Sequence, residues 1–407
     1  MLADGGGKAR YGRVPARMKV CDLALFAPSS SSGVRTYISS KIEYVRERSD
    51  IDHVVIVPGP SDGLSIDGRT RVMVVRGIQS PYPGVWVGVN LVRIAKLIDR
   101  EAPDIIELNC QYTLGWAAFL ATRRRRTPIV GVYHTDLPAC ARHWALPAGK
   151  MIASAIERIV EFYEGLIYRH CTLTILLNAR MGDRVARLGV HRTRCLPCGV
   201  DPAMFTPARR DIDVRRRFGI TPEQKVIFYA GRLSPEKELE VLFDAFDQLP
   251  KGDFVLMVAG DGPDAPAVAR YATTRPHVHY LGHIDSRSDL ATAYASSDVF
   301  VIPGRYETFG MSTLEAMASG LPVAGIESSG TASVVPPHAG VMVTPGNAAE
   351  LAAAIRTVTT WDPETTREAC HRFAAAGFAW DRVFDRYFDT YRELIAAAAC
   401  AEAGVPA

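Results

Sequence analysis

The sequence predicts an α/β fold made of two doubly wound, Rossmann-like domains that face each other across a cleft. Short apolar runs alternate with longer helix-period segments along most of the 407 residues, as in parallel sheets with crossover helices. This alternation stops at residues 199–218, which are rich in Pro, Asp and Arg, and then begins again. A chain of this length exceeds one typical hydrophobic core, and length alone suggests two or three domains.

Strand and helix segments follow one another in the same way in both halves. Strand-length apolar runs predict strands at residues 19–26, 53–57, 71–75, 105–108, 129–133, 173–177, 226–230, 254–259, 278–280, 299–302 and 322–325. Segments with helical periodicity predict helices at residues 34–48, 90–101, 151–168, 238–248, 289–295 and 312–319. We therefore predict an N-terminal domain at residues 18–200 and a second domain at residues 201–379.

The two ends of the chain carry different signals. Residues 1–17 are basic but contain no apolar run, so they predict a disordered extension and not a secretory signal. The last helix, at about residues 380–399, is expected to pack back onto the N-terminal domain. Its aromatic residues recur at helical spacing and predict a packing surface: Trp380, Phe384, Tyr387 and Tyr391.

Composition and charge exclude several classes of protein. The 47 basic and 44 acidic residues give a net charge of +3, too balanced for a dedicated nucleic-acid binder. No apolar run has the length of a membrane span, and eight scattered cysteines suit a reducing, cytoplasmic compartment. Cys195 and Cys198 have redox or zinc spacing but lack a second pair, which favours small packing residues. The basic run at residues 123–126 favours a solvated face over peripheral contact with anionic lipid.

The segment at residues 299–325 carries the strongest chemical signal. A buried strand there runs into a turn with Gly310 and then into a helix that begins near Met311. The first turn of a helix offers unpaired N–H groups and a positive dipole end, and glycine lets an anion approach the backbone. Ser312 and Thr313 add hydroxyl donors. The segment therefore predicts a cradle for a diphosphate.

Charged residues near predicted strand ends extend this interpretation. Glu307 precedes the helix and is expected to accept hydrogen bonds from sugar hydroxyls, and Glu315, one turn inside it, from a ribose diol. Arg232 and Lys237 follow another predicted strand, and two cations five residues apart suit one diphosphate. The alternative for all four is a solvated surface position. Their place beyond the carboxyl ends of strands, where ligands of parallel sheets bind, disfavours that alternative.

The N-terminal half offers further candidates. His134 directly follows a predicted strand, although lone histidines are often structural. Asp136 is a weaker candidate, for contact with an acceptor. Residues 142–144 are suited to shape an acceptor pocket, and helix packing explains them equally well. Gly33 lies in the Ser/Gly-rich loop that follows the first strand.

These segments resemble glycosyltransferase family 4, a family of retaining enzymes with the GT-B fold. The stretch from Glu307 to Glu315 is similar to the E-x7-E signature of the family, and Arg232 with Lys237 to its Gly-Arg…Lys element. Other similar segments spread the resemblance over about residues 18–399: Gly33-Val34, Gly199-Val-Asp201 with Phe205, Ala259-Gly-Asp-Gly-Pro263, Gly282-His-Ile284 and Trp380. The sequence departs from the family where Ser32 replaces a glycine and where residues 328–333 end without a carboxylate.

The resemblance implies transfer of a hexose from a nucleoside diphosphate sugar to a hydroxyl acceptor with retention at the anomeric carbon. It assigns catalysis to His134, Glu307, Arg232 and Lys237. It assigns substrate contacts to a larger set: Gly33, Asp136, Gly262, Ile284, Phe309, Gly310, Met311, Ser312, Thr313 and Glu315. The nucleotide is expected on the second domain and the acceptor on the first.

Several points stay open at this stage. No metal or other cofactor is expected, because the Asp-x-Asp triplets at residues 50–52 and 211–213 lie at polar junctions and not after core strands. The signature fits UDP-, GDP- and ADP-linked sugars alike, and a glycan, a glycolipid or a small metabolite as acceptor. A sugar-nucleotide epimerase and a non-catalytic sugar-nucleotide-binding protein would share the architecture. An epimerase would form product without any acceptor, and the intact set of catalytic candidates argues against a non-catalytic protein.

Overall fold

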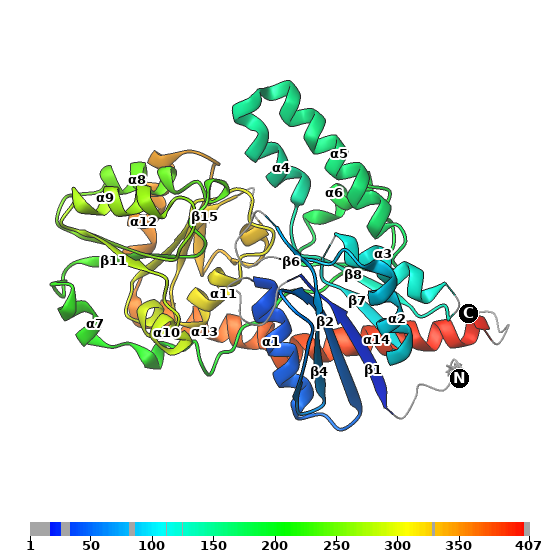
Figure 1. The fold of residues 1–407 in the computed structure, drawn as a ribbon. Coiled ribbons are helices and arrows are strands. Elements are labelled where there is room, and N and C mark those ends of the chain that lie inside the picture. Colours follow the sequence, from blue (N-terminus) through cyan, green and yellow to red (C-terminus); the bar gives the residue numbers. More distant parts are fainter. Residues whose placement is uncertain are drawn as a thin grey trace, which may run out of the picture.

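The protein folds into two α/β lobes that lie side by side in the computed structural model (Figure 1). The structure describes residues 17–25, 33–80, 86–110, 112–123, 125–327 and 330–402. Most of the predicted extension at residues 1–17, the Ser-rich part of the loop before Gly33, and residues 124, 328 and 329 lie outside the described residues. No helix among the described residues is long and apolar enough to cross a bilayer.

The first lobe contains an eight-stranded sheet with the strand order β10-β9-β8-β7-β1-β2-β4-β3. Its strands are β1 (Met18–Leu23), β2 (Ile51–Gly59), β3 (Gly63–Asp67), β4 (Thr70–Arg76), β7 (Ile105–Leu108), β8 (Ile129–Tyr133), β9 (Leu173–Leu176) and β10 (Thr193–Cys195). Its helices are α1 (Gly33–Arg46), α2 (Leu91–Glu101), α3 (Thr113–Thr122), α4 (Leu137–Ala145), α5 (Lys150–Tyr168) and α6 (Met181–Arg187). A separate two-stranded sheet joins β5 (Ile78–Gln79) to β6 (Trp86–Val87).

One edge of the first sheet differs from the predicted parallel arrangement. Strand β3 pairs antiparallel with β4, whereas the other neighbours in this sheet pair in parallel. Every residue of β3 is exposed, so the strand has no apolar run for the sequence to show. The parallel prediction is therefore wrong at this hairpin and correct for the rest of the sheet.

The second lobe contains a six-stranded parallel sheet with the order β13-β12-β11-β14-β15-β16. This is the order of the dinucleotide-binding fold, in which the direction of winding reverses at the first strand. Its strands are β11 (Lys225–Ala230), β12 (Phe254–Ala259), β13 (Val278–Gly282), β14 (Val299–Ile302), β15 (Val323–Ile326) and β16 (Gly340–Val343). Its helices are α7 (Ile212–Arg217), α8 (Leu239–Asp247), α9 (Ala265–Thr273), α10 (Arg287–Ala295), α11 (Met311–Ala318), α12 (Ala348–Thr359) and α13 (Pro363–Phe378).

The last helix, α14 (Trp380–Glu402), runs from the second lobe along the first (Figure 1). The chain crosses at Gly199, where a Cβ would lie 2.5 Å from the indole of Trp380. The N–H of Val200 donates to the Phe378 carbonyl at 2.8 Å, which ties the two crossing segments together. Aromatic residues of α14 then pack on α1, and Trp380 lies edge-on to Tyr37 with ring centroids 6.0 Å apart. The predicted aromatic stripe is thus part of the core.

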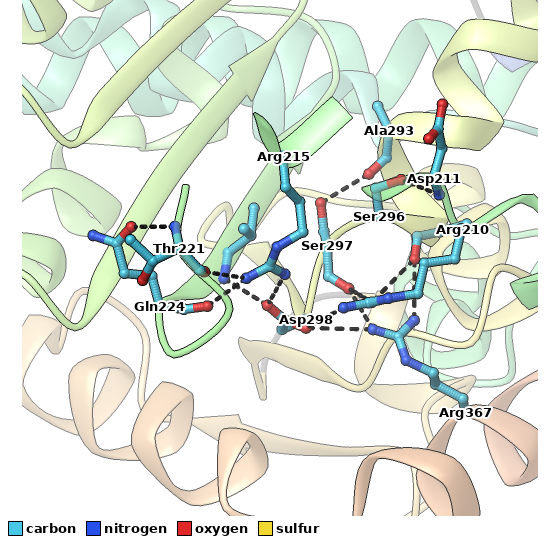
Figure 2. A network of polar contacts seen from close by, with 12 residues as sticks. Arg210, Asp211, Arg215, Thr221, Gln224, Ala293, Ser296, Ser297, Asp298 and Arg367 are labelled. Atoms are coloured by element: carbon cyan, nitrogen blue, oxygen red, sulfur yellow. Dashed lines mark hydrogen bonds and ion pairs between the residues drawn. The ribbon is translucent and has the colours of Figure 1, made fainter. Parts of the chain in front are cut away.

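A partly buried ion cluster fixes the connector to the second lobe (Figure 2). Arg215 donates to the Asp298 carboxylate at 2.8 Å, and Arg210 and Arg367 approach the other carboxylate oxygen at 3.4 Å. Both of these arginines also donate to the Ser297 carbonyl, where a helix C-terminus favours positive charge. The arginine-rich stretch that separates the two halves of the sequence is therefore a structural clamp.

Candidate active site

The two lobes bring the carboxyl ends of their central strands toward each other. In the second lobe the strand order reverses between β11 and β14, which pair in parallel. Ligands of open parallel sheets bind at this kind of switch point. The segment after β11 carries Arg232 and Lys237, and the loop after β14 carries Glu307. The structure thus gathers three of the four predicted catalytic residues around one switch point.

Lys237 and Glu307 form an ion pair between these two loops, with the amine hydrogen-bonded to the carboxylate. Their side chains are only 20% and 15% exposed. Burial alone favours the neutral amine, but the Glu307 carboxylate outweighs it and raises the pKa of Lys237 above its usual value. Gly304 permits the approach, since a Cβ there would lie 3.1 Å from the Lys237 Cα. The Lys237 amine is therefore held in its charged form at the switch point.

Gly310 begins helix α11 in a left-handed conformation, at φ 82°. A side chain here would be strained, and its Cβ would lie 2.5 Å from the Thr331 hydroxyl oxygen. The hydroxyls of Thr313 and Thr331 are buried and have no hydrogen-bond partner among the described residues. Backbone N–H groups and unpaired hydroxyls therefore gather at the start of α11, where an anion is favoured.

The first helix of the other lobe reaches the same point. Gly33 begins α1 and lies so close to Met311 that a Cβ on it would be 3.3 Å from the Met311 sulfur. The N-termini of α1 and α11 therefore meet between the lobes, and both are positive dipole ends. Figure 1 shows the two helices beside each other at this junction. Two predicted substrate contacts from distant parts of the chain are thus brought together.

His134 directly follows β8, at the carboxyl end of this interior strand of the first sheet. Its Nε2 lies 2.8 Å from the Asn109 Oδ1, and its ring meets Tyr37 edge-on with centroids 5.3 Å apart. Burial, helped by the charge of Lys41, lowers the pKa of His134 to about 3. The imidazole is therefore neutral near pH 7 and serves as a hydrogen-bonding group, not as a cation.

A buried polar network continues from Asn109 into the first lobe, and the sequence did not predict it. The Asn109 amide donates to Glu107 at 2.8 Å, and Lys41 donates to the same carboxylate oxygen at 2.6 Å. Lys41 also pairs with Asp22 at 3.0 Å, and all three charged side chains are fully buried. The available signal was the presence of Asp22 and Glu107 inside apolar strand runs, where an uncompensated charge is costly.

Asp136 is the N-cap of α4. Its carboxylate accepts from the Ala139 N–H at 3.2 Å and from Arg184 at 3.2 Å. Its own N–H donates to the Thr308 hydroxyl at 3.3 Å, which joins the end of β8 to the Glu307 loop. These contacts give Asp136 a structural role, and its predicted contact with an acceptor stays a prediction.

Helix α4 also reaches the loop that carries Lys237. The indole N–H of Trp144 donates to Glu236 at 3.2 Å, and the rings of His143 and Tyr306 lie 5.0 Å apart. Two of the residues 142–144, His143 and Trp144, therefore contact the second lobe, whereas Arg142 pairs with Glu157 of the first lobe. This part of α4 forms one wall of the junction between the lobes.

Glu315 lies one turn inside α11, and its side chain is 13% exposed. Arg287 approaches it at 3.5 Å, and the Tyr294 hydroxyl donates to it at 3.5 Å. Burial raises the pKa of Glu315 to about 7, although Arg287 opposes the shift. The carboxyl group is therefore poised between its two forms near neutral pH.

The loop after β12 rests on the segment that carries Arg232. Gly262, at φ 153°, allows this contact, because a Cβ there would lie 2.2 Å from the Leu233 carbonyl oxygen. Gly260 allows a similar contact, because a Cβ there would lie 1.9 Å from the Gly231 carbonyl oxygen. Arg232 itself is exposed beside these glycines. Gly262 therefore positions the backbone around the predicted diphosphate site.

The remaining predicted contacts differ in how much of each side chain is accessible. Ser312 is partly buried in the first turn of α11, and Ile284 is partly buried against the core. Phe309 is buried, with only 3% of its surface exposed. No group of three His, Cys, Asp or Glu side chains that could hold a metal occurs among the described residues. In the Asp-x-Asp triplets, Asp211 caps α7 and Asp52 pairs with Arg69.

Comparison with known proteins decides the family. The profile of Glycosyltransferase Family 4 matches residues 31–204, and that of Glycosyl transferases group 1 matches residues 211–380. A GDP-mannose-dependent alpha-mannosyltransferase from Mycobacterium tuberculosis is 30% identical over 313 residues, which cover 75% of this chain and 78% of that protein. The chain belongs to glycosyltransferase family 4.

Two further likenesses agree with this family 4 assignment. Sulfoquinovosyl transferase from Arabidopsis thaliana is 30% identical over 351 residues, 83% of this chain and 66% of that protein. The solved structure of sucrose-phosphate synthase from Thermosynechococcus elongatus matches with a TM-score of 0.77 at 20% identity, over 94% of this chain and 100% of that chain. The predicted GT-B fold and glycosyltransferase class are confirmed, and the epimerase and non-catalytic alternatives are not favoured.

Proposed function

We propose that this family 4 enzyme transfers a hexose from a nucleoside diphosphate sugar to a hydroxyl acceptor, with retention at the anomeric carbon. The observation that carries the proposal is the Lys237–Glu307 ion pair beside the start of α11. A cation, a carboxylate and an anion cradle stand together at one switch point. They suit the diphosphate and the hydroxyls of a sugar nucleotide.

The positive groups bind the diphosphate and stabilise its departure. Lys237 and Arg232 supply cations, and the N–H groups near Gly310 supply backbone donors. Negative charge on the diphosphate increases as the bond to the sugar breaks, so these groups bind the transition state more tightly than the ground state. Because the chain itself supplies this positive charge, we propose that no metal is required.

Hydrogen-bond acceptors of the protein orient the donor sugar. Glu307 accepts from its hydroxyls, and neutral His134 contributes a ring nitrogen. Glu307 already accepts a hydrogen bond from Lys237, which favours a role in orienting the sugar over that of a covalent nucleophile. We propose that an oxygen of the departing phosphate accepts the proton of the acceptor hydroxyl, which attacks on the same face and retains the configuration. Closure of the lobes excludes water, a competing acceptor.

The nucleotide lies on the second lobe, with Glu315 accepting from the ribose diol. The mycobacterial relative is named for GDP-mannose, so GDP-mannose is the first donor to test. Thermal unfolding of the protein with GDP-mannose, UDP-glucose and ADP-glucose identifies the base, because a ligand of the native state raises its stability. One donor is expected to raise the melting temperature, and transfer to an acceptor is then measured with it. If none of these sugar nucleotides stabilises the protein, the proposal is contradicted.

We further propose that the acceptor is presented at an anionic lipid surface. Helices α4 and α5 project from the first lobe (Figure 1), and α5 exposes large apolar side chains along its outer face: Met151, Ile152, Ile159 and Phe162. Arg158 is exposed on the same helix. The acidic Glu157 and Glu161 instead pair with Arg184 at 3.2 and 3.0 Å. The outer face thus combines apolar and basic groups, as peripheral membrane helices do.

Co-sedimentation with vesicles tests this contact. Ile159→Asp is expected to abolish binding to vesicles that contain phosphatidylserine. The matched control is Ile66→Asp on β3, since both isoleucines are 68% exposed. Equal binding by the two variants, or no binding of the unmodified protein, overturns the membrane contact. A change of oligomeric state in Ile159→Asp would instead make this face a protein interface.

A further inference from the structure

The hydrogen bonds below His134 determine which form of the imidazole the enzyme presents. The His134 Nε2 lies 2.8 Å from the Asn109 Oδ1, and the Asn109 Nδ2 lies 2.8 Å from the Glu107 Oε1. A side-chain amide has one donating end and one accepting end. The orientation of Asn109 therefore decides which ring nitrogen of His134 carries the proton.

Glu107 fixes the orientation of this amide. Its Oε1 accepts from the Lys41 amine at 2.6 Å, and its Oε2 accepts from the Tyr37 hydroxyl at 3.1 Å. Since both carboxylate oxygens act as acceptors, the end of Asn109 that faces Glu107 must be the donating NH2 group. Lys41 is held from its other side by Asp22 at 3.0 Å. The whole arrangement is buried, so water does not compete for these groups.

The accepting end of Asn109 consequently faces His134. The ring donates through Nε2–H, and Nδ1 is left with a free lone pair. Nδ1 has no hydrogen-bond partner within the part of the chain that the structure describes. The ring stands close to the proposed sugar site, because Asp136, two residues further on, contacts Thr308 next to Glu307.

We propose that Asn109 is a positioning residue that holds His134 as the Nε2–H tautomer, so that Nδ1 accepts a hydrogen bond from a hydroxyl of the donor sugar. The identity of that hydroxyl rests on the proposed function, whereas the tautomer does not. Glu307 is also an acceptor, so the site requires hydroxyl donors at two positions of the sugar. A donor analogue with hydrogen or fluorine in place of the hydroxyl that meets His134 is therefore a poor substrate.

Nitrogen-15 spectra of the histidine rings test the tautomer in the full chain. They are recorded near pH 8, above the pKa of Glu107, which burial raises to about 7. His134, assigned by its loss in His134→Gln, is expected to show a protonated Nε2 and a bare Nδ1. Asn109→Leu removes the acceptor at similar volume and is expected to give a mixture of tautomers. Asn109→Asp keeps an oxygen acceptor toward His134, and the buried carboxyl pair that it forms with Glu107 shares one proton, so this variant is expected to restore the Nε2–H form.

A matched control comes from the far end of the same buried network. Thr70→Val removes a hydroxyl that lies 3.1 Å from the Nδ1 of His53. This variant is expected to lower the melting temperature as Asn109→Leu does, but to leave the His134 spectrum unchanged. If Asn109→Leu also leaves that spectrum unchanged, Asn109 is only a structural residue and the proposal is overturned. A protonated Nδ1 in the unmodified protein overturns it as well.

Steady-state kinetics test whether Asn109 also affects the rate of the reaction. Asn109→Leu is expected to lower kcat by about 10- to 100-fold, the range found for groups that orient metal-binding histidines, with a smaller change in the KM of the donor. Asn109→Asp should recover part of this loss. If the protein transfers no hexose but shows the predicted tautomers, the proposed function is contradicted. The role of Asn109 in holding the His134 tautomer is then still supported.

Discussion

Lys237 and Glu307 form a single ion pair although they are 70 residues apart in the chain. They meet because β11 and β14 are neighbours in the sheet only through the reversal of its strand order. Without a donor, each charge compensates the other. A bound sugar nucleotide would offer phosphate oxygens to the amine and hydroxyls to the carboxylate. Before the donor binds, the site therefore already holds a positive group for the diphosphate and a negative group for the sugar, on either side of the bond that breaks.

Replacement of Lys237 by methionine tests the diphosphate contact. Methionine keeps the apolar stem but removes the charge, so kcat/KM for the donor is expected to fall by about 100-fold or more. The variant also leaves the Glu307 carboxylate without its partner, which should lower the melting temperature. Lys225→Met, at the opposite end of β11, is the control and should keep normal kinetics. Equal kcat/KM values for the two variants would exclude Lys237 from the diphosphate site.

The Gly310→Ala variant tests the backbone cradle. Alanine is strained at φ 82°, and its Cβ would lie 2.5 Å from the Thr331 hydroxyl. Gly252→Ala is a matched control, because Gly252 has φ 93° and a Cβ added there would meet no atom within 4 Å. Both variants should lose about 1 kcal/mol of stability from backbone strain. Only Gly310→Ala should also weaken binding of the nucleoside diphosphate, measured by calorimetry.

The carboxyl group of Glu315 predicts a pH dependence of stability. Burial raises its pKa from 4.5 to about 7, so the native state keeps a proton that the unfolded chain loses. The resulting stabilisation is complete below about pH 4.5 and is lost as the pH rises through about 7. It amounts to at most about 3 kcal/mol. Urea unfolding at several pH values should show this loss in the unmodified protein and a flatter profile in Glu315→Gln.

The same group predicts a pH dependence of donor binding. In the proposed complex, ionised Glu315 would accept hydrogen bonds from both ribose hydroxyls, whereas the protonated form has one acceptor fewer. The affinity for the nucleotide should therefore rise as the pH passes through about 7. Isothermal titration across this range checks the trend. An equally steep rise in Glu315→Gln would assign the effect to another group.

The crossing of the chain between the lobes gives a stability prediction. In Gly199→Ala, the new Cβ would lie 2.5 Å from the Trp380 indole, so α14 must shift. We expect a loss of about 1–3 kcal/mol, the cost of overpacking a close contact. Gly377→Ala, in α13, meets no atom within 4 Å and should be neutral or slightly stabilising. Denaturant unfolding of the two variants measures the difference.

Among the strands, the sequence predicted best those whose side chains are uniformly buried. Strands β12 and β14 match the predicted residues 254–259 and 299–302, because an unbroken apolar run has defined ends. Strand β3 was missed because all its residues are exposed. Helix α3 was missed because its apolar residues lie on all sides and leave no helical period. Local patterns therefore fail for a strand that is exposed throughout and for a helix whose sequence is apolar on every side.

The candidate site was predictable one loop at a time. Arg232, Lys237 and Glu307 were found because charged residues after core strands are informative in a parallel sheet. The contact between Gly33 and Met311 depends on how the lobes pack, which spacing along the chain does not encode. Asn109 was missed because its role lies in a hydrogen bond to His134, 25 residues away.

The most direct test of the central proposal is the Glu307→Gln variant, assayed with the sugar nucleotide that stabilises the protein. Glutamine keeps the size of the side chain and removes the charge that pairs with Lys237 and that we propose receives the sugar hydroxyls. Hexose transfer should fall by about 100-fold or more, while thermal stabilisation by the nucleoside diphosphate persists. Transfer near the unmodified rate would contradict the assignment of Glu307 and the function built on it.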